Sequence, residues 1–288
     1  MPEMNGLGLL RVAAANALLY LHPQNSGGRQ MPRRFIDISA GLKAGIASDP
    51  APMLPKIAYS NHTDGAATFA AQFPGLTADQ LPEGMGAAVE TVTISTHNGT
   101  HLDAPWHFHP TMNNGERAIT IDEVPLEWCF SDGVKFDFRN KPDGYVCTAD
   151  DMKRELDRIG YTLKPLDIVL VNTAAGKAYG NDDFLHKGCG MGREATLFLT
   201  RQGVRVTGTD GWSWDAPFSA TAKRFAETRD PSIIWEGHKA SMEIGYCHME
   251  KLGNLETLPS HGFVVSCFPV KIYKASAGWT RAVAIMDD

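Results

Sequence analysis

The segment STHNGTHLDAPWHFHP, residues 95–110, concentrates metal-binding residue types in a short stretch. It holds four of the ten histidines of the chain and one aspartate. The positions of His97, His101 and Asp103 differ by four and by two. Side chains two apart in an extended chain share a face, so these three donors are predicted to converge on one point. A helix would also bring the two histidines together, but the nearby glycine, threonine and proline disfavour one.

Two imidazoles and one carboxylate are a donor set for a divalent metal ion. Zn²⁺, Mn²⁺ and Fe²⁺ all accept such ligands, and three protein ligands leave positions open for water and substrate. A single histidine is more often a hydrogen-bonded loop residue than a ligand. Several polar donors in one place, however, are costly to desolvate unless something binds them. The segment therefore predicts a metal site.

His107 follows Asp103 by four residues, beyond a proline. A histidine beside a metal can titrate near neutral pH, and we predict that His107 is a general acid or base. An alternative pairs His107 with His109 as the ligands of a cupin-like iron dioxygenase. That pattern places a glutamate nearer than Glu116, which is seven residues after His109. The spacing therefore favours the first interpretation.

The rest of the chain predicts an α/β fold. Alternating or apolar runs typical of strands occur at 34–39, 87–96, 133–140, 167–174, 204–210, 262–272 and 280–286. Helices are predicted at 148–160, at 192–203 and in part of 240–258. Residues 40–87 show no clear period and predict a long loop or an excursion over the surface. Because strands alternate with some of the helices, we expect one α/β domain built around a mixed sheet.

The amino-acid composition limits which binding partners and which cellular compartment are expected. The formal charge of −6 offers no basic surface for nucleic acid. Five scattered cysteines without a CxxC pair predict neither a disulfide framework nor a thiolate zinc site, and they fit a reducing cytoplasm. Residues 6–21 are apolar but too short to span a bilayer, and Arg11 interrupts them. We predict an N-terminal extension at 1–30, a helix followed by a linker, with an export signal as the alternative, and a compact domain at 31–288.

The segment HNGTHLDAPWHF resembles the signature of the cyclase family of metal-dependent hydrolases. That signature is His-x-Gly-Thr-His-x-Asp-x-Pro-x-His, and every fixed position from His97 to His107 matches. The family includes bacterial kynurenine formamidase and isatin hydrolase. Downstream, GHKASMEIGYCHMEKLGNL supplies His238 and, twelve residues later, Glu250. Segments around Asp210 and Arg281 are also similar, and the resemblance runs from about residue 34 to the C-terminus.

The resemblance implies specific ligands for one or two zinc or manganese ions. A first ion would be bound by His97, His101 and Asp103. In two-metal relatives, Asp103 would bridge to a second ion held by His238 and Glu250. His107 would be the catalytic acid or base. We interpret His248 as structural, because on a helix it would point away from Glu250.

The resemblance also implies the family's swivelling β/β/α fold, a homodimer or homotetramer, and hydrolysis by metal-activated water. The bond cleaved would be an amide or ester bond, in a cyclic or aryl amide, a formamide or a lactone. Four aromatic residues near the donors are predicted to stack on a flat small-molecule substrate, with core packing as the alternative: Trp106, Phe108, Trp212 and Trp214. No membrane partner is expected. A protein that binds metal or a small molecule without catalysis is a further alternative.

Overall fold

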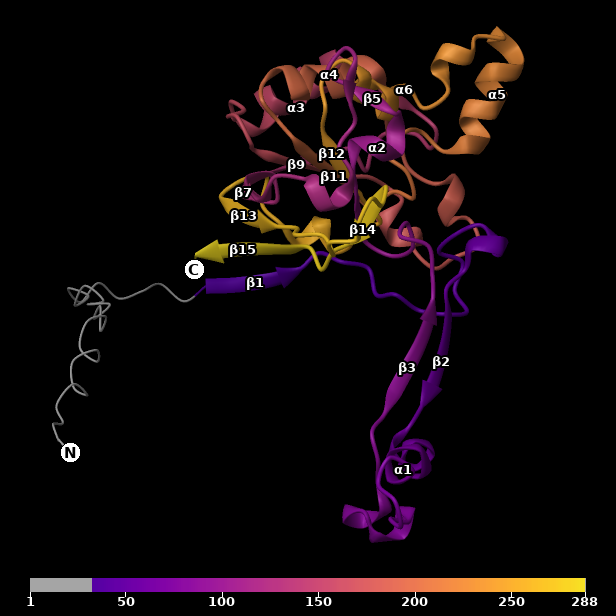
Figure 1. The fold of residues 1–288 in the computed structure, drawn as a ribbon. Helices are drawn as coiled ribbons and strands as arrows, with labels where there is room; N and C mark the ends of the chain where they lie inside the picture. Colours follow the sequence, from indigo (N-terminus) through magenta and orange to yellow (C-terminus); the bar gives the residue numbers. More distant parts are fainter. Residues whose placement is uncertain (1–32, 288) are drawn as a thin grey trace, which may run out of the picture. The chain divides into compact units, whose positions relative to one another are not determined.

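The computed structural model describes residues 33–287, so the extension predicted at 1–30 and its boundary lie outside the described part of the chain. Nine strands of the described part form one mixed sheet, in the order β1-β15-β13-β7-β9-β11-β12-β4-β14 (Figure 1). These strands are β1 Arg33–Asp37, β4 His101–Asp103, β7 Phe130–Asp137, β9 Ile168–Asn172, β11 Val206–Thr209, β12 Cys247–Glu250, β13 Phe263–Ser266, β14 Ala277–Trp279 and β15 Val283–Asp287. The predicted mixed α/β fold is confirmed.

The centre of the sheet is parallel and its margins are antiparallel. β7, β9, β11 and β12 run parallel to their neighbours in this group, whereas β4 is antiparallel to both β12 and β14. Every residue of β9 is buried. Ile168 and Leu170 join the core on one face, and Val169 and Val171 join the core on the other. Such a strand reads as a continuous apolar run because both of its faces are covered.

Helices α3 (Ala149–Ile159) and α4 (Arg193–Arg201) cover one face of the sheet (Figure 1). α3 has the predicted ends. The Thr148 side chain accepts a hydrogen bond from the backbone of Asp151, and Gly160 ends the helix with φ of 66°. The remaining α-helices are α1 His62–Ala70, α2 Pro105–Phe108, α5 Phe218–Thr228 and α6 Glu236–Lys239.

Short elements complete the described chain. The 3₁₀ turns are η1 Ala51–Met53, η2 Ala78–Gln80, η3 Pro82–Gly84, η4 Ile121–Glu123, η5 Leu126–Trp128, η6 Gly176–Ala178, η7 Phe184–His186, η8 Pro231–Ile233, η9 Ala240–Met242 and η10 Leu255–Thr257. Two small strand pairs lie outside the large sheet. β8 (Val146–Cys147) pairs with β10 (Gly190–Met191) in parallel, and β5 (Thr111–Met112) pairs with β6 (Glu116–Arg117) antiparallel. None of the helices described between residues 33 and 287 is long and apolar enough to cross a membrane.

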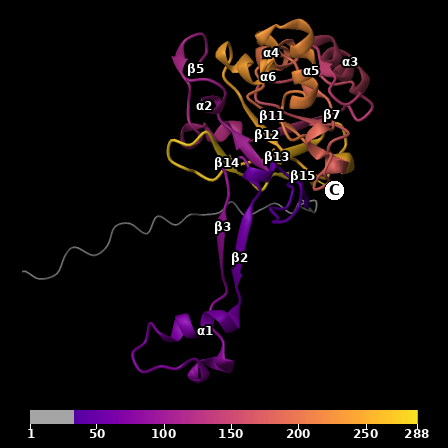
Figure 2. The same ribbon diagram turned by 90° about the vertical axis from the view of Figure 1, so that its right-hand side faces the viewer.

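Two predictions of local structure were wrong. Residues 40–87 are not one loop, because β2 (Lys56–Ser60) pairs with β3 (Val89–Thr93) in a separate ribbon that ends at α1 (Figure 2). Most side chains of β2 are exposed on both faces, so residues 56–60 carry no clear alternating pattern. β3 lies within the strand predicted at 87–96. The segment 240–258 contains two 3₁₀ turns, but its middle is the strand β12 rather than a helix.

Candidate metal centre

The paired strands β4 and β12 form the floor of a histidine-rich centre. Their register places His248 opposite Asp103 and Glu250 opposite His101. Residues two apart on a strand share a face, so all four side chains lie on the same side of the sheet. All four are buried. Two segments far apart in the sequence thus contribute two donors each.

His97 reaches the centre from a turn rather than from the strand. Gly99 has φ of +61°, a left-handed conformation that glycine adopts without steric cost. The turn brings His97 Nδ1 to 3.0 Å from Asp103 Oδ1. The predicted extended spacing is therefore right for His101 and Asp103 and wrong for His97, although all three side chains do meet.

Two other fixed positions of the signature, and Asp210 from a second segment of the resemblance, hold the backbone in place. Thr100 Oγ1 donates a hydrogen bond to the Lys251 carbonyl at 2.5 Å and accepts one from the Ala40 amide at 2.8 Å. Pro105 occupies the first turn of α2, where a missing amide hydrogen costs nothing. Asp210 accepts hydrogen bonds from Thr173 and Asn172, which joins the ends of β11 and β9.

His238 enters from α6 and is oriented by a carboxylate. Its Nδ1 donates to Asp215 Oδ2 at 2.5 Å, and Asp215 also accepts from the backbone amides of Gly237 and His238. This fixes the ring so that Nε2 faces Glu250 Oε1 at 3.7 Å. A carboxylate behind a histidine is the usual support of a metal ligand. Asp215 was not identified from the sequence, because its link to His238 exists only in the fold.

The carboxylates of Asp103 and Glu250 each direct one oxygen toward His101 and the other toward His248. Asp103 Oδ1 lies 3.0 Å from His97 and 3.2 Å from His101, whereas Oδ2 lies 3.2 Å from His248. Glu250 Oε2 lies 3.6 Å from His101, whereas Oε1 lies 3.2 Å from His248 and 3.7 Å from His238. The donors therefore divide into two groups that share Asp103 and Glu250.

Several of these donors are buried without a partner. His101 Nε2, both carboxylate oxygens of Asp103 and His248 Nε2 have no hydrogen bond within the described chain. The other nitrogen of His101, Nδ1, donates to the Gly99 carbonyl at 2.9 Å, which leaves Nε2 free for a ligand. Unpartnered buried polar atoms are costly, and neighbouring ligands of one ion stand about 3–3.5 Å apart. The residues therefore fit a divalent metal ion.

Burial and neighbouring charges shift the pKa values of Asp103 and His107. Burial alone would raise the pKa of Asp103, but the imidazoles of His101, His107 and His97 hold it well below its usual range. Burial lowers the pKa of His107 to about 4, and His97 and His238 add to the shift. The His107 ring is therefore neutral at pH 7 and able to accept a proton.

A cavity of about 150 Å³ opens beside these donors. Its wall includes His97, His107, Trp212, Phe218, Trp235 and His238. Of the predicted aromatic contacts, Trp212 lines this cavity and Trp106 does not. Phe108 and Trp214 are buried and stack on the His248 ring, beneath the donors. Trp235 was missed; it stacks on His238 with centroids 4.6 Å apart and has φ of 58°, which is rare for a bulky residue.

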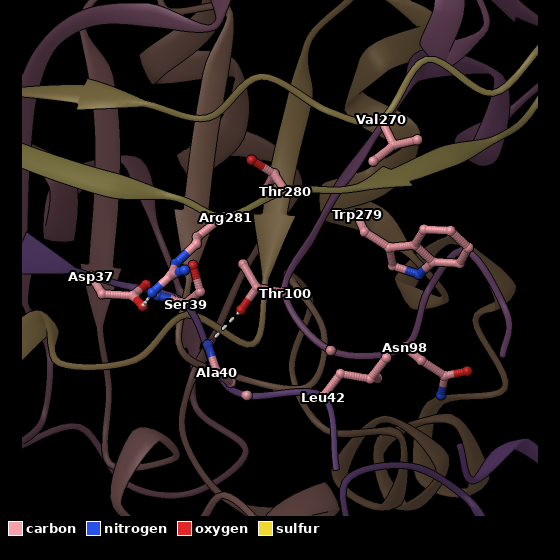
Figure 3. A pocket seen from close by; sticks show the side chains of 12 residues that line it. Asp37, Ser39, Ala40, Leu42, Asn98, Thr100, Val270, Trp279, Thr280 and Arg281 are labelled. Atoms are coloured by element: carbon pink, nitrogen blue, oxygen red, sulfur yellow. Dashed lines mark hydrogen bonds and ion pairs between the residues drawn. The ribbon is translucent and has the colours of Figure 1, made fainter. Parts of the chain in front are cut away.

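A second cavity, of about 400 Å³, lies elsewhere (Figure 3). It is lined by none of the side chains that converge at the centre, namely His97, His101, Asp103, His107, His238, His248 and Glu250. Arg281 lines it and pairs with Asp37 at 2.9 Å. Trp279, Leu42 and Val270 contribute apolar wall, as Figure 3 shows. The chemistry of the histidine segment therefore belongs to the smaller cavity.

A buried ion pair anchors the histidine turn. Lys251 Nζ lies 2.7 Å from Asp49 Oδ1 and donates to the His97 carbonyl at 2.6 Å. Asp49 also accepts hydrogen bonds from Trp212 Nε1 and Asn98 Nδ2. This network joins the segment before the ribbon, the histidine turn and the end of β12. Neither Asp49 nor Lys251 was singled out from the sequence.

Asp49→Ala is expected to destabilise the protein by about 3–5 kcal/mol, because it leaves the Lys251 ammonium buried without its carboxylate. Urea unfolding followed by circular dichroism measures the loss. The double variant Asp49→Leu with Lys251→Met is the control, since removing both charges should cost less than removing one. Equal losses in the two variants would contradict an energetic role for the pair.

Asp215→Asn is expected to weaken metal binding about 10–100-fold, because an amide no longer holds His238 as a carboxylate does. Competition with a chelating dye measures the dissociation constant. Glu194→Gln, at an exposed position on α4, is the control for loss of a carboxylate. An affinity equal to that of the unmodified protein would show that Asp215 does not orient the ligand.

Known proteins share this sequence pattern and fold. The family model described as Cyclase matches residues 36–216. Kynurenine formamidase from Erythrobacter litoralis is 26% identical over 204 residues, covering 71% of this chain and 80% of its own. The formamidase from Bacillus thuringiensis is 25% identical over 179 residues, covering 61% and 68%.

Solved structures have a similar fold. An isatin hydrolase bound to the product analogue thioisatinate superimposes with a TM-score of 0.69 at 17% identity, covering 89% of this chain and 93% of its own. Isatin hydrolase A from Labrenzia aggregata gives 0.68 at 21% identity, covering 89% and 94%. A cupin-like dioxygenase is not favoured by these findings. The local geometry agrees, because His107 groups with His97 and Asp103, and none of the candidate metal-binding groups among the described residues includes His109.

Proposed function

Because this chain belongs to the cyclase family, we propose that it is a metal-dependent hydrolase that cleaves the C–N bond of an amide. The observation that carries the proposal is the convergence of buried, unpartnered imidazole and carboxylate donors beside His107 and a cavity. The relatives named as kynurenine formamidases support amide hydrolysis, and those named as isatin hydrolases share the fold.

In this proposal His97, His101 and Asp103 would hold a first ion, and Asp103, His238 and Glu250 would hold a second. Each bound ion supplies a Lewis acid that lowers the pKa of water from 15.7 to about 7 and polarises a carbonyl. Imidazole and carboxylate ligands favour zinc or manganese.

His107 performs the proton transfer. Its neutral ring lies with its centroid 4.2 Å from that of His97 and lines the cavity, so it can take a proton from the attacking water. It then donates that proton to the leaving nitrogen or oxygen. A positioned general acid or base of this kind contributes about 10²–10⁴-fold to the rate.

The cavity suits a flat substrate of modest size. Trp212, Phe218 and Trp235 provide aromatic surface next to the donors. Offset stacking on such rings favours an aryl formamide or an isatin-like lactam, and an aryl lactone would also fit. We also propose a cytoplasmic homodimer or homotetramer, on the basis of the cysteine usage and the family resemblance.

A hydrolysis screen tests the proposal. Protein loaded with Zn²⁺ or Mn²⁺ is assayed with an aryl formamide, an isatin-like lactam and an aryl lactone, under air and without oxygen. We expect turnover of at least one amide that is independent of oxygen, is lost after chelation and returns with metal. Tight metal binding without hydrolysis across the panel would instead support a non-catalytic binding protein.

A further inference from the structure

We propose that His248 is a fourth protein ligand of the second ion, together with Asp103, His238 and Glu250, and that these four donors leave no open coordination position on that ion. The inference rests on the proposed function only in assuming that the centre binds divalent metal. His248 was interpreted as structural because a helix would turn it away from Glu250. β12 is a strand, however, and it places His248 and Glu250 on one face.

The distances fit coordination of a common ion. His248 Nε2 lies 3.2 Å from Asp103 Oδ2 and 3.2 Å from Glu250 Oε1. The residue is fully buried, and its Nε2 makes no hydrogen bond to any described residue. One donor atom from each of Asp103, His238, His248 and Glu250 can be chosen so that all four lie within 4.8 Å of one another. Ligands about 2.0–2.2 Å from a shared ion have such separations.

The surroundings fix the plane of the His248 ring. Phe108 stacks on it with centroids 4.8 Å apart and an interplanar angle of 16°. Trp214 is also nearly parallel to it, at 5.9 Å and 19°. Nδ1 faces the Tyr246 hydroxyl at 3.4 Å, so Nε2 is the nitrogen directed at the carboxylates. A ring held this way needs little reordering to bind an ion.

A fourth protein donor at the second ion would give the two subsites different roles. Zinc sites that are structural are typically four-coordinate and closed, whereas catalytic sites have three protein ligands and an open position. The second ion would therefore hold Asp103 and Glu250 in place. Water and substrate would bind at the first ion, beside His97 and the cavity.

Cobalt substitution tests this assignment without using activity. Four-coordinate Co²⁺ absorbs visible light much more strongly than six-coordinate Co²⁺, so geometry can be read from the spectrum. We expect the unmodified protein to bind about two Co²⁺ per chain and to absorb strongly, because a site with three protein ligands and one water is four-coordinate as well. His248→Gln and His248→Ala should each lose about one ion per chain together with the part of the spectrum that belongs to that ion. His97→Ala should weaken the other ion and keep that part of the spectrum.

His261→Ala is the matched control, because it removes an imidazole that stacks on Tyr161 outside the centre. It should keep both ions and the spectrum, and circular dichroism checks that every variant is folded. An unchanged spectrum and ion count in folded His248→Gln would overturn the inference, as would a single ion in the unmodified protein. A protein that binds both ions as expected but fails the hydrolysis screen would contradict only the proposed function.

Discussion

Asp103→Ala is expected to leave the protein with almost no bound metal and to lower turnover by at least about 10⁴-fold. The reason is geometric. One oxygen of Asp103 faces His97 and His101 at 3.0 and 3.2 Å, and the other faces His248 at 3.2 Å. A single side chain therefore contributes to both groups of donors, and its loss should affect both ions.

Metal analysis after extensive dialysis, together with the hydrolysis rate, measures this effect. Asp150→Ala is the control, since Asp150 is an exposed carboxylate on α3 that pairs with Lys153 at 2.9 Å. The control should keep its metal and its rate. If the Asp103 variant retained two ions, the bridging assignment would be wrong, and two separate ligand sets would have to replace it.

The sequence predicted the first half of the centre because local chemistry determines it. The donors at His97, His101 and Asp103 lie within seven residues, and their types alone indicate metal. What the spacing could not reveal is how His97 arrives, since a positive φ at Gly99 replaces the expected extended chain with a turn. The same three side chains meet by a different backbone path.

The second half could not be derived from local pattern. β12 is four residues long and every one of them is buried, so its polar and apolar residues give no clean alternation. Its Met, Glu and Lys neighbours are good helix formers, which favoured a helix in the sequence. The choice between helix and strand decides whether His248 faces Glu250. Only the pairing of β12 with β4 settles that choice.

The residues that position the donors could not be identified from the sequence, because their contacts form only in the fold. Asp49 and Asp215 act through contacts with residues distant in the sequence, Lys251 and His238. Trp235 stacks on His238, three residues later. A lone aspartate or tryptophan carries no periodic signal. Strand β2 was missed because a strand exposed on both faces resembles a loop in sequence, whereas β3 lies within the strand predicted at 87–96.

His107→Ala is expected to keep the metal and to lower turnover about 10²–10⁴-fold, because it removes a base rather than a ligand. His107 Nε2 lies 3.9 Å from Asp103 Oδ2, farther than His97, His101 or His248 lie from that carboxylate. Its ring is nevertheless close enough to be a ligand in a three-residue set with His97 and Asp103. The two roles therefore need a direct comparison of metal content and rate.

Metal content, kcat and rescue by free imidazole separate the two roles of His107. A general base predicts a full metal complement, a reduced kcat and partial recovery when imidazole is added to the alanine variant. A ligand predicts loss of metal that parallels the loss in Asp103→Ala. His109→Ala, which removes a nearby imidazole bonded to Thr111, should change neither quantity. Equal metal loss in the His107 and Asp103 variants would assign His107 to the metal and leave proton transfer to another group.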